Sequence, residues 1–189
     1  MEIEVPYLVF EVNRDEYMID AYFSKKLERI ERISTLIRPI DRTLLKTAEE
    51  PLPILLQKNE VEEFLKNLFV EVYERSGEKL NERLRHMRKW NLFRFIGIPT
   101  GFSRHVEKDE QLAKENREAM LSLAILRKIL GVKTPTELDK VKILPKEYLY
   151  YRIKLKNKEI FNEKGEKDFI YTQLLEIDDG FRKALLSRI

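Results

Sequence analysis

The sequence predicts a mainly α protein of the α+β class, in which a helical bundle is followed by a short antiparallel β domain. Three observations support this prediction. Apolar residues recur at helical spacing through most of the first 130 residues. Pro135 and Pro145 then mark a break, and beyond Pro145 apolar and polar residues alternate with the period of a strand. We therefore expect a helical bundle domain over residues 1–131, a linker over 132–146 and a small β-rich domain over 147–189.

The N-terminal segment predicts one extended stretch and one helix. Residues 5–12, VPYLVFEV, are apolar and β-branched enough for a short strand or a buried extended segment. Asn13 with Glu16 three residues later has the form of a capping box, which favours a helix from this point. The apolar residues that follow at helical spacing end at Pro39, which cannot continue a helix.

Two longer helical patterns follow. The first starts near residue 55 or 59 and reaches Phe95, and Gly77 predicts a kink or a break within it. Residues 97–101 have the composition of a loop. The last pattern runs from near Glu107 to residue 130, with Gly131 placed as the residue that ends it. These patterns indicate a bundle of about three to five helices.

The C-terminal segment predicts a hairpin, a further strand and a short closing helix. We expect strands over residues 148–155, 158–162 and 168–177, with a hairpin turn over 163–167. An Asp at 178 or 179 can cap the last helix. In the first of these strands, one face should carry Leu149, Tyr151, Ile153 and Leu155, and the other Tyr148, Tyr150, Arg152 and Lys154.

The composition limits the classes of function. There is no cysteine, which excludes disulfides, cysteine-ligated zinc fingers and Fe–S clusters. The 36 Lys and Arg residues nearly balance 33 Asp and Glu, which argues against a chain that coats nucleic acid through bulk charge. With 37% charged residues, the composition is typical of a thermophile's protein. The acidic N-terminus and the absence of a long apolar run predict a cytoplasmic protein without a membrane span.

Catalytic motifs are missing from the sequence. Neither phosphate-binding glycine motif occurs, and there is no G-x-S-x-G sequence. The two histidines, His86 and His105, lack the spacing that places two metal ligands on one helix face. Asp178 and Asp179 are adjacent, but a helix cap explains them better than a metal site. We expect no enzyme, no cofactor and no metal, and leave a metal-dependent nuclease open as an alternative.

The densest positive charge lies between Lys79 and His105, a segment that contains seven Lys or Arg residues and only one acidic residue. On a helix, Arg85, Arg88 and Lys89 form one ridge opposite an apolar stripe that includes Leu80, Leu84 and Met87. This ridge is typical of a helix face bound by a protein partner or by the chain's own β module, of a nucleic-acid contact, or of a solvated face. The predicted interface residues are Arg83, Arg85, Arg88, Lys89, Trp90, Arg94, Tyr148, Tyr150 and Arg152.

The stretch LNERLRHMRKWNLFRFIG, residues 80–97, resembles the Arg-rich helix of the GINS family, in the archaeal class whose helical domain precedes its β domain. Residues 144–189, from LPKEYLYYRIKL to the closing ALLSRI, look like the β domain of that family. The resemblance covers roughly residues 55–189.

This resemblance implies a non-catalytic, nucleoid-associated subunit of a DNA-replication complex. The expected partners are a GINS paralogue, the MCM helicase and a Cdc45/RecJ-type protein, in a hetero-tetramer held by a bundle of helices from several subunits, with a possible DNA contact. One alternative is a nucleic-acid-binding accessory protein of an archaeon or archaeal virus that uses residues 83–105. The other is the metal-dependent nuclease.

Overall fold

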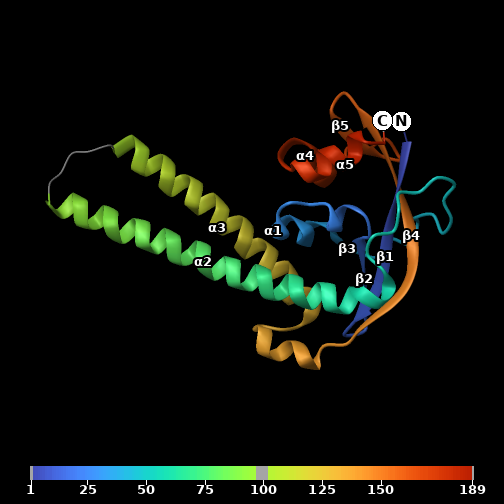
Figure 1. Ribbon diagram of the computed structural model, residues 1–189, viewed down its shortest axis with the longest axis horizontal. Helices are drawn as coiled ribbons and strands as arrows, with labels where there is room; N and C mark the ends of the chain where they lie inside the picture. Colours follow the sequence, from blue (N-terminus) through green and yellow to red (C-terminus); the bar gives the residue numbers. More distant parts are fainter. Residues whose placement is uncertain (1, 97–101, 189) are drawn as a thin grey trace.

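The computed structural model describes residues 2–96 and 102–188, and it describes side chains over 2–91 and 104–188. Its centre is a five-stranded antiparallel sheet with the strand order β3-β2-β1-β4-β5. Figure 1 shows the sheet at one end of the molecule, with both chain termini beside it. The strands are β1 (Glu2–Val12), β2 (Asp15–Asp20), β3 (Ile37–Pro39), β4 (Ile143–Lys156) and β5 (Glu159–Asn162).

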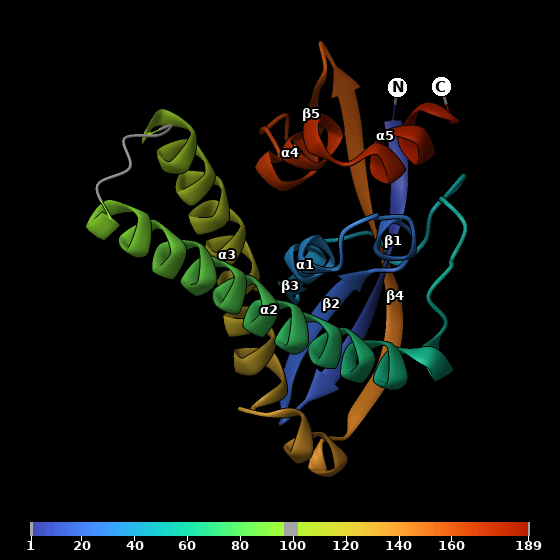
Figure 2. The same ribbon diagram turned by 60° about the vertical axis from the view of Figure 1, so that its left-hand side comes forward.

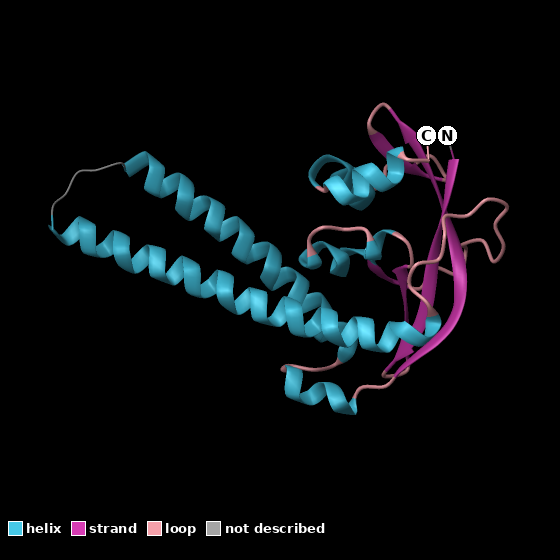
Figure 3. Cartoon of the chain, viewed as in Figure 1, coloured by secondary structure: helices cyan, strands magenta, loops and turns pink. Residues whose placement is uncertain are grey.

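Two long helices form an antiparallel hairpin that projects away from the sheet, and we call this hairpin the arm (Figures 1 and 2). The shorter helices lie close to the sheet (Figure 3). The α-helices are α1 (Ile30–Ile33), α2 (Val61–Ile96), α3 (Phe102–Leu130), α4 (Phe169–Ile177) and α5 (Asp179–Leu186). The 3-10 helices are η1 (Phe23–Lys25), η2 (Ser34–Leu36), η3 (Lys58–Glu60) and η4 (Pro135–Lys140).

The prediction of a helical bundle followed by a β domain is wrong, because the sheet begins at the N-terminus. β1 lies in the middle of the sheet and pairs with β4, with Ile3 opposite Ile153 and Leu8 opposite Tyr148. The arm is therefore inserted between strands of one sheet, and β4 begins at Ile143, inside the predicted linker at 132–146.

The helix predicted from Asn13 to Pro39 is also wrong. Asn13 and Arg14 have φ values of 54° and 71°, so they form a tight turn that joins β1 to β2. The Asn13 side chain donates to the carbonyl of Leu130 at 3.0 Å, and so does not cap a helix. Of the apolar residues after it, Ile19 pairs with Leu8 and with Ile37 across strands, and only short helical turns, η1, α1 and η2, lie between Ile19 and Ile37.

The strand predicted over residues 168–177 is a helix. Asp168 precedes it, and its carboxylate accepts a hydrogen bond from the backbone N–H of Tyr171 at 2.9 Å, as a helix cap does. Tyr171 and Leu174 are buried three positions apart, which suits a helix that packs one side against the sheet. The β-branched and aromatic residues of this segment are compatible with a strand and with a helix, so the composition alone did not decide between the two.

Several predicted elements are confirmed. The strand expected at residues 5–12 is part of β1, and the two long helical patterns are α2 and α3. α3 ends at Leu130 and is followed by Gly131, which has a φ of 68°, as expected. The break predicted at Gly77 is wrong, because α2 continues through this residue. The helix expected near residue 178 is α5, capped by Asp178. The loop predicted at residues 97–101 lies outside the described residues.

Both faces of β1 are buried, because the strand separates two hydrophobic cores. Leu8 and Phe10 face the first core, which the bases of α2 and α3 complete. Tyr7 and Val9 face the second core, which includes residues of α4 and α5. The predicted orientation of residues 148–155 is confirmed, since Leu149, Tyr151, Ile153 and Leu155 all belong to or pack on the second core.

Candidate interaction surface on the arm

The arm is held together by polar and aromatic contacts between α2 and α3. Lys79 contacts Glu115 at 2.5 Å, and Arg83 lies 3.6 Å from Asp109. Nearer the tip, the rings of Trp90 and His105 stack with their centroids 4.4 Å apart. With 36 residues in α2, the helix spans about 54 Å at 1.5 Å per residue. The arm therefore extends well beyond the two cores.

An apolar stripe runs along the outer part of the arm. On α2, Leu80 and Met87 are seven residues apart and Leu84 lies between them. On α3, Val106 and Met120 are fourteen residues apart. These five side chains, which we call the arm stripe, are between 39% and 44% exposed although the sequence pattern favours burial.

Contacts at both ends place the two halves of the arm stripe on one side of the arm. Met87 and Val106 line the same cleft near the tip, with a volume of about 310 Å³. At the base, the Arg127 guanidinium lies 5.8 Å from the ring centroid of Tyr73. Tyr73 is seven residues before Leu80, and Arg127 is seven residues after Met120. The arm stripe thus follows a seven-residue repeat on both helices, which is typical of a surface that packs against further helices.

The predicted basic ridge lies on the same part of α2. Arg85, Arg88 and Lys89 are exposed, and in the described part of the chain none has an ion-pair partner. Arg83 is partly buried beside Asp109 and so contributes to the contact between α2 and α3 within the arm. The predicted interface residue Trp90 stacks on His105, and the side chain of Arg94 lies outside the described residues.

The predicted interface residues of β4 lie far along the chain from the arm tip and have partners within the chain. The Tyr148 hydroxyl donates to the carbonyl of Leu56 at 3.3 Å. The backbone N–H of Tyr150 donates to the carbonyl of Leu45 at 2.8 Å. Arg152 contacts Glu4 at 2.8 Å and also reaches Glu2 and Glu163. The structure therefore does not bring these three residues together with the basic ridge of α2.

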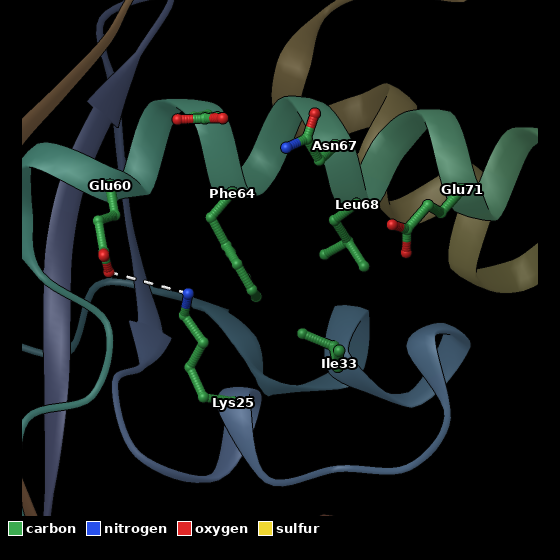
Figure 4. A pocket seen from close by; sticks show the side chains of 8 residues that line it. Lys25, Ile33, Glu60, Phe64, Asn67, Leu68 and Glu71 are labelled. Carbon is green, nitrogen blue, oxygen red and sulfur yellow. Dashed lines mark ion pairs between the residues drawn. The ribbon is translucent and has the colours of Figure 1, made fainter.

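A cleft of about 370 Å³ lies where α2 passes over η1 and α1 (Figure 4). Phe64 and Leu68 of α2 point into it and meet Ile33 of α1. Lys25 spans one end, 3.8 Å from Glu60 and 4.9 Å from the centroid of the Phe64 ring. The chain thus places its own ammonium group on the ring, in the position that a bound cation would take.

A buried polar network connects four strands to α4, and sequence reasoning missed it. The Asp20 carboxylate is fully buried and accepts hydrogen bonds from the backbone N–H groups of Tyr22 and Phe23, at 2.8 and 2.6 Å, and from the Tyr171 hydroxyl. The Tyr7 hydroxyl lies 2.7 Å from that of Tyr171. Because Tyr171 uses its hydrogen for Asp20, Tyr7 is the donor in this second bond.

The second half of this network is an ion pair. The Arg38 guanidinium donates to both carboxylate oxygens of Asp168, at 3.1 to 3.3 Å, and the Tyr151 hydroxyl donates to the same carboxylate at 2.8 Å. The guanidinium also lies 5.3 to 5.9 Å from the ring centroids of Tyr7, Tyr151 and Tyr171.

Burial governs the protonation of this network. Loss of hydration raises the pKa of Asp20 to about 6, although three hydrogen bonds and Arg38 oppose the rise. Burial also raises the pKa values of Tyr7 and Tyr171 well above the ordinary value of a tyrosine. Since Tyr7, Asp20 and Tyr171 are fully buried, we interpret the network as the connection between α4 and the sheet.

Comparison of the chain with protein-family models, with curated proteins and with solved structures finds no match. Across residues 2–96 and 102–188, no three His, Asp or Glu side chains are arranged to hold a metal ion. None of the described helices has the length and apolar character needed to cross a bilayer. The surface that stands out on chemical grounds is therefore the outer half of the arm.

Proposed function

We propose that this chain is a non-catalytic assembly subunit whose arm packs against helices of another protein chain. The arm stripe is the observation that supports this proposal. Its five large apolar side chains lie on one side of a projecting hairpin, each about two fifths exposed. Contiguous exposed apolar surface is uncommon on monomers and marks interaction sites. The seven-residue spacing specifies helices as the partner.

The energy available from the arm stripe suits a specific but modest interface. Full burial of a Leu or Met side chain contributes about 1.5–3 kcal/mol, so covering the exposed two fifths of five such chains contributes about 3–6 kcal/mol. Association itself costs a comparable amount, so further contacts are needed. Arg85, Arg88 and Lys89 lie opposite the arm stripe on α2, so they supply such contacts only to a partner that extends around α2 and presents carboxylates there.

The resemblance to the GINS family gives a narrower form of this proposal. In that form the partner is a paralogue, and the assembly binds both the MCM helicase and a Cdc45/RecJ-type protein at the nucleoid. The exposed arm stripe supports the part of this hypothesis that concerns an intermolecular helical bundle. The domain order found here gives it no support, so we propose the replication role only as the first identity to test for the partner.

The test is purification of the tagged chain from an extract of its native organism, with the mass of the complex measured by light scattering and its members identified by mass spectrometry. We expect a complex larger than the monomer. Leu80→Glu with Met87→Glu should reduce it to the monomer, because both charges would be buried in the interface. Glu74→Lys with Glu78→Lys is the matched control, since both are exposed on α2 away from the arm stripe. Equal masses for the two double variants would contradict the proposal.

A nucleic-acid contact is the second candidate function, and the unpaired ridge of Arg85, Arg88 and Lys89 favours it. Neutralising about three phosphates would give a salt dependence with a log–log slope of about −2 to −3. Binding of single-stranded and duplex DNA at several salt concentrations measures this slope. A triple change of the ridge to Gln should abolish binding if the ridge is the site, and unchanged binding would exclude this ridge.

A further inference from the structure

A second groove, separate from the arm stripe, lies between α1–η2, α3 and α4. Its volume is about 330 Å³, at the lower end of the range for small-molecule sites. Five aliphatic side chains form most of its wall, and no aromatic ring lines it. These side chains are Leu121, Ile125, Ile170, Leu174 and Ile177.

The groove is open and its apolar character reaches the surface. Leu121 is 58% exposed and Ile177 is 45% exposed, one on each side of the opening. Its base is fixed, because the Ser122 hydroxyl donates to the carbonyl of Glu31 at 2.7 Å and so joins α3 to α1. This bond fixes α3 against α1, while α4 forms the other side of the opening.

One cation lines this groove, and two of its nitrogen atoms have no hydrogen-bond partner in the described part of the chain. The Arg32 side chain belongs to α1, and its Nε and Nη1 atoms are buried but have no hydrogen-bond acceptor. Buried guanidinium donors are normally paired, and an unpaired one requires an explanation. The neighbouring Glu31 carboxylate pairs with Arg75 of α2 through Oε1, and its Oε2 atom is buried without a hydrogen bond to Arg32 or to any other group in the described residues. Glu31 and Glu118 both line the groove, so two acids of the chain oppose an incoming anion, and one of them, Glu31, is paired with Arg75.

We infer that this groove binds an aliphatic carboxylate of medium chain length, with the carboxylate on Arg32 and the chain against the aliphatic wall. A carboxylate matches the fork of guanidinium donors and forms charge-assisted hydrogen bonds with it. The absence of aromatic rings and the small volume favour a flexible alkyl chain over a planar ring system. The groove shares no residue with the arm stripe, so this inference does not depend on the proposed function.

Calorimetric titration of the full chain with decanoate, 1-decanol and decyltrimethylammonium, below their micelle concentrations and at one ionic strength, tests the inference. We expect saturable binding of decanoate, weaker binding of the alcohol and none of the ammonium compound. Arg32→Gln should weaken decanoate binding about tenfold or more and change the affinity for decanol less than about twofold, because only the charged contact is lost. Glu118→Gln should strengthen decanoate binding.

An apolar variant tests the wall of the groove independently of the cation. Leu121→Glu should abolish binding of both decanoate and decanol, and the chain should stay folded because Leu121 is an exposed residue. Leu144→Glu, at a 53% exposed position of β4 outside the groove, is the matched control and should bind as the unaltered chain does. Thermal melts establish that each variant is folded, and if Arg32→Gln does not fold, Leu121→Glu decides. The inference is overturned if decanoate shows no saturable binding or if the ammonium compound binds equally well. It is also overturned if a folded Arg32→Gln or Leu121→Glu variant binds decanoate as the unaltered chain does.

Discussion

The fully buried carboxylate of Asp20 gives the most quantitative prediction. Its pKa is raised from 3.8 to about 6 by burial, so between these values the folded state binds more protons than the unfolded state. The contribution of Asp20 to stability is therefore greatest below about pH 4 and is lost as the pH rises through about 6. A difference of about 2 between the two pKa values corresponds to about 3 kcal/mol.

Asp20→Asn removes the charge and keeps the shape. The amide oxygen can still accept from the backbone N–H groups of Tyr22 and Phe23, and the amide nitrogen can donate to the Tyr171 hydroxyl. We expect the free energy of unfolding of the variant, relative to that of the unaltered chain, to rise by about 2 kcal/mol between pH 4 and pH 7, because part of the total of about 3 kcal/mol falls below pH 4. Taking the difference between the two proteins cancels the titration of every other group.

The assay is urea unfolding of both proteins at pH 4, 5, 6 and 7, followed by circular dichroism. Asp41→Asn is the control, because hydrogen bonds from Thr43 lower the pKa of Asp41. Its contribution is present at neutral pH and is lost only as the pH falls through its lowered pKa, so its difference should be flat over this range. A constant difference for Asp20→Asn across the four pH values would refute the reasoning that burial sets the protonation of this group.

Four further predictions concern the rest of the buried network and two glycines. Arg38→Met removes the cation that pairs with the Asp168 carboxylate, whose side chain is 5% exposed. The free energy of unfolding in urea should fall by about 3–5 kcal/mol, because a buried charge is left unpaired. A decrease below about 1 kcal/mol would show that the ion pair does not stabilise the fold. Gly180→Ala should lower the melting temperature, because a Cβ there would lie 2.1 Å from the carbonyl oxygen of Lys26. Gly77→Ala should stabilise the chain by about 0.5–1 kcal/mol, since it lies inside α2 with open space around it, and a destabilised variant would contradict the continuous helix. Tyr7→Phe should cost about 1 kcal/mol by the loss of one buried hydrogen bond, and no change in unfolding free energy would contradict the network.

The long helices were predictable from sequence because their apolar repeat extends over many turns. The base of α2, from Val61 to Val72, and the end of α3 at Gly131 have the expected pattern and the expected burial. The predicted stripe at Leu80, Leu84 and Met87 exists, but the single chain leaves it exposed. Periodicity identifies the face of a helix that prefers burial, and it contains no information on whether the chain itself or another chain covers that face.

The position of the sheet was not predictable in the same way. The β2 sequence, DEYMID, alternates over only six residues, and its pairing with β1 depends on a turn at Asn13 and Arg14 that also has the form of a helix cap. The pairing of β1 with β4 joins residues about 150 positions apart, and local patterns do not specify such long-range pairs. The buried polar network was not predicted for the same reason, because Asp20, Arg38 and Asp168 come together only when the sheet has formed.

The central claim is that the arm stripe is covered by helices of another protein chain, and crosslinking from a single position tests it most directly. Met87 replaced by p-benzoylphenylalanine places a photoreactive group in the arm stripe, and the same replacement at Glu78 places it on an exposed part of α2 outside the stripe. After irradiation in the native organism's extract, we expect one protein, or a second copy of the chain, attached through residue 87, with the attached residues in a helix, and no specific product from residue 78. The same products from both positions, or none from residue 87, would contradict the proposed assembly.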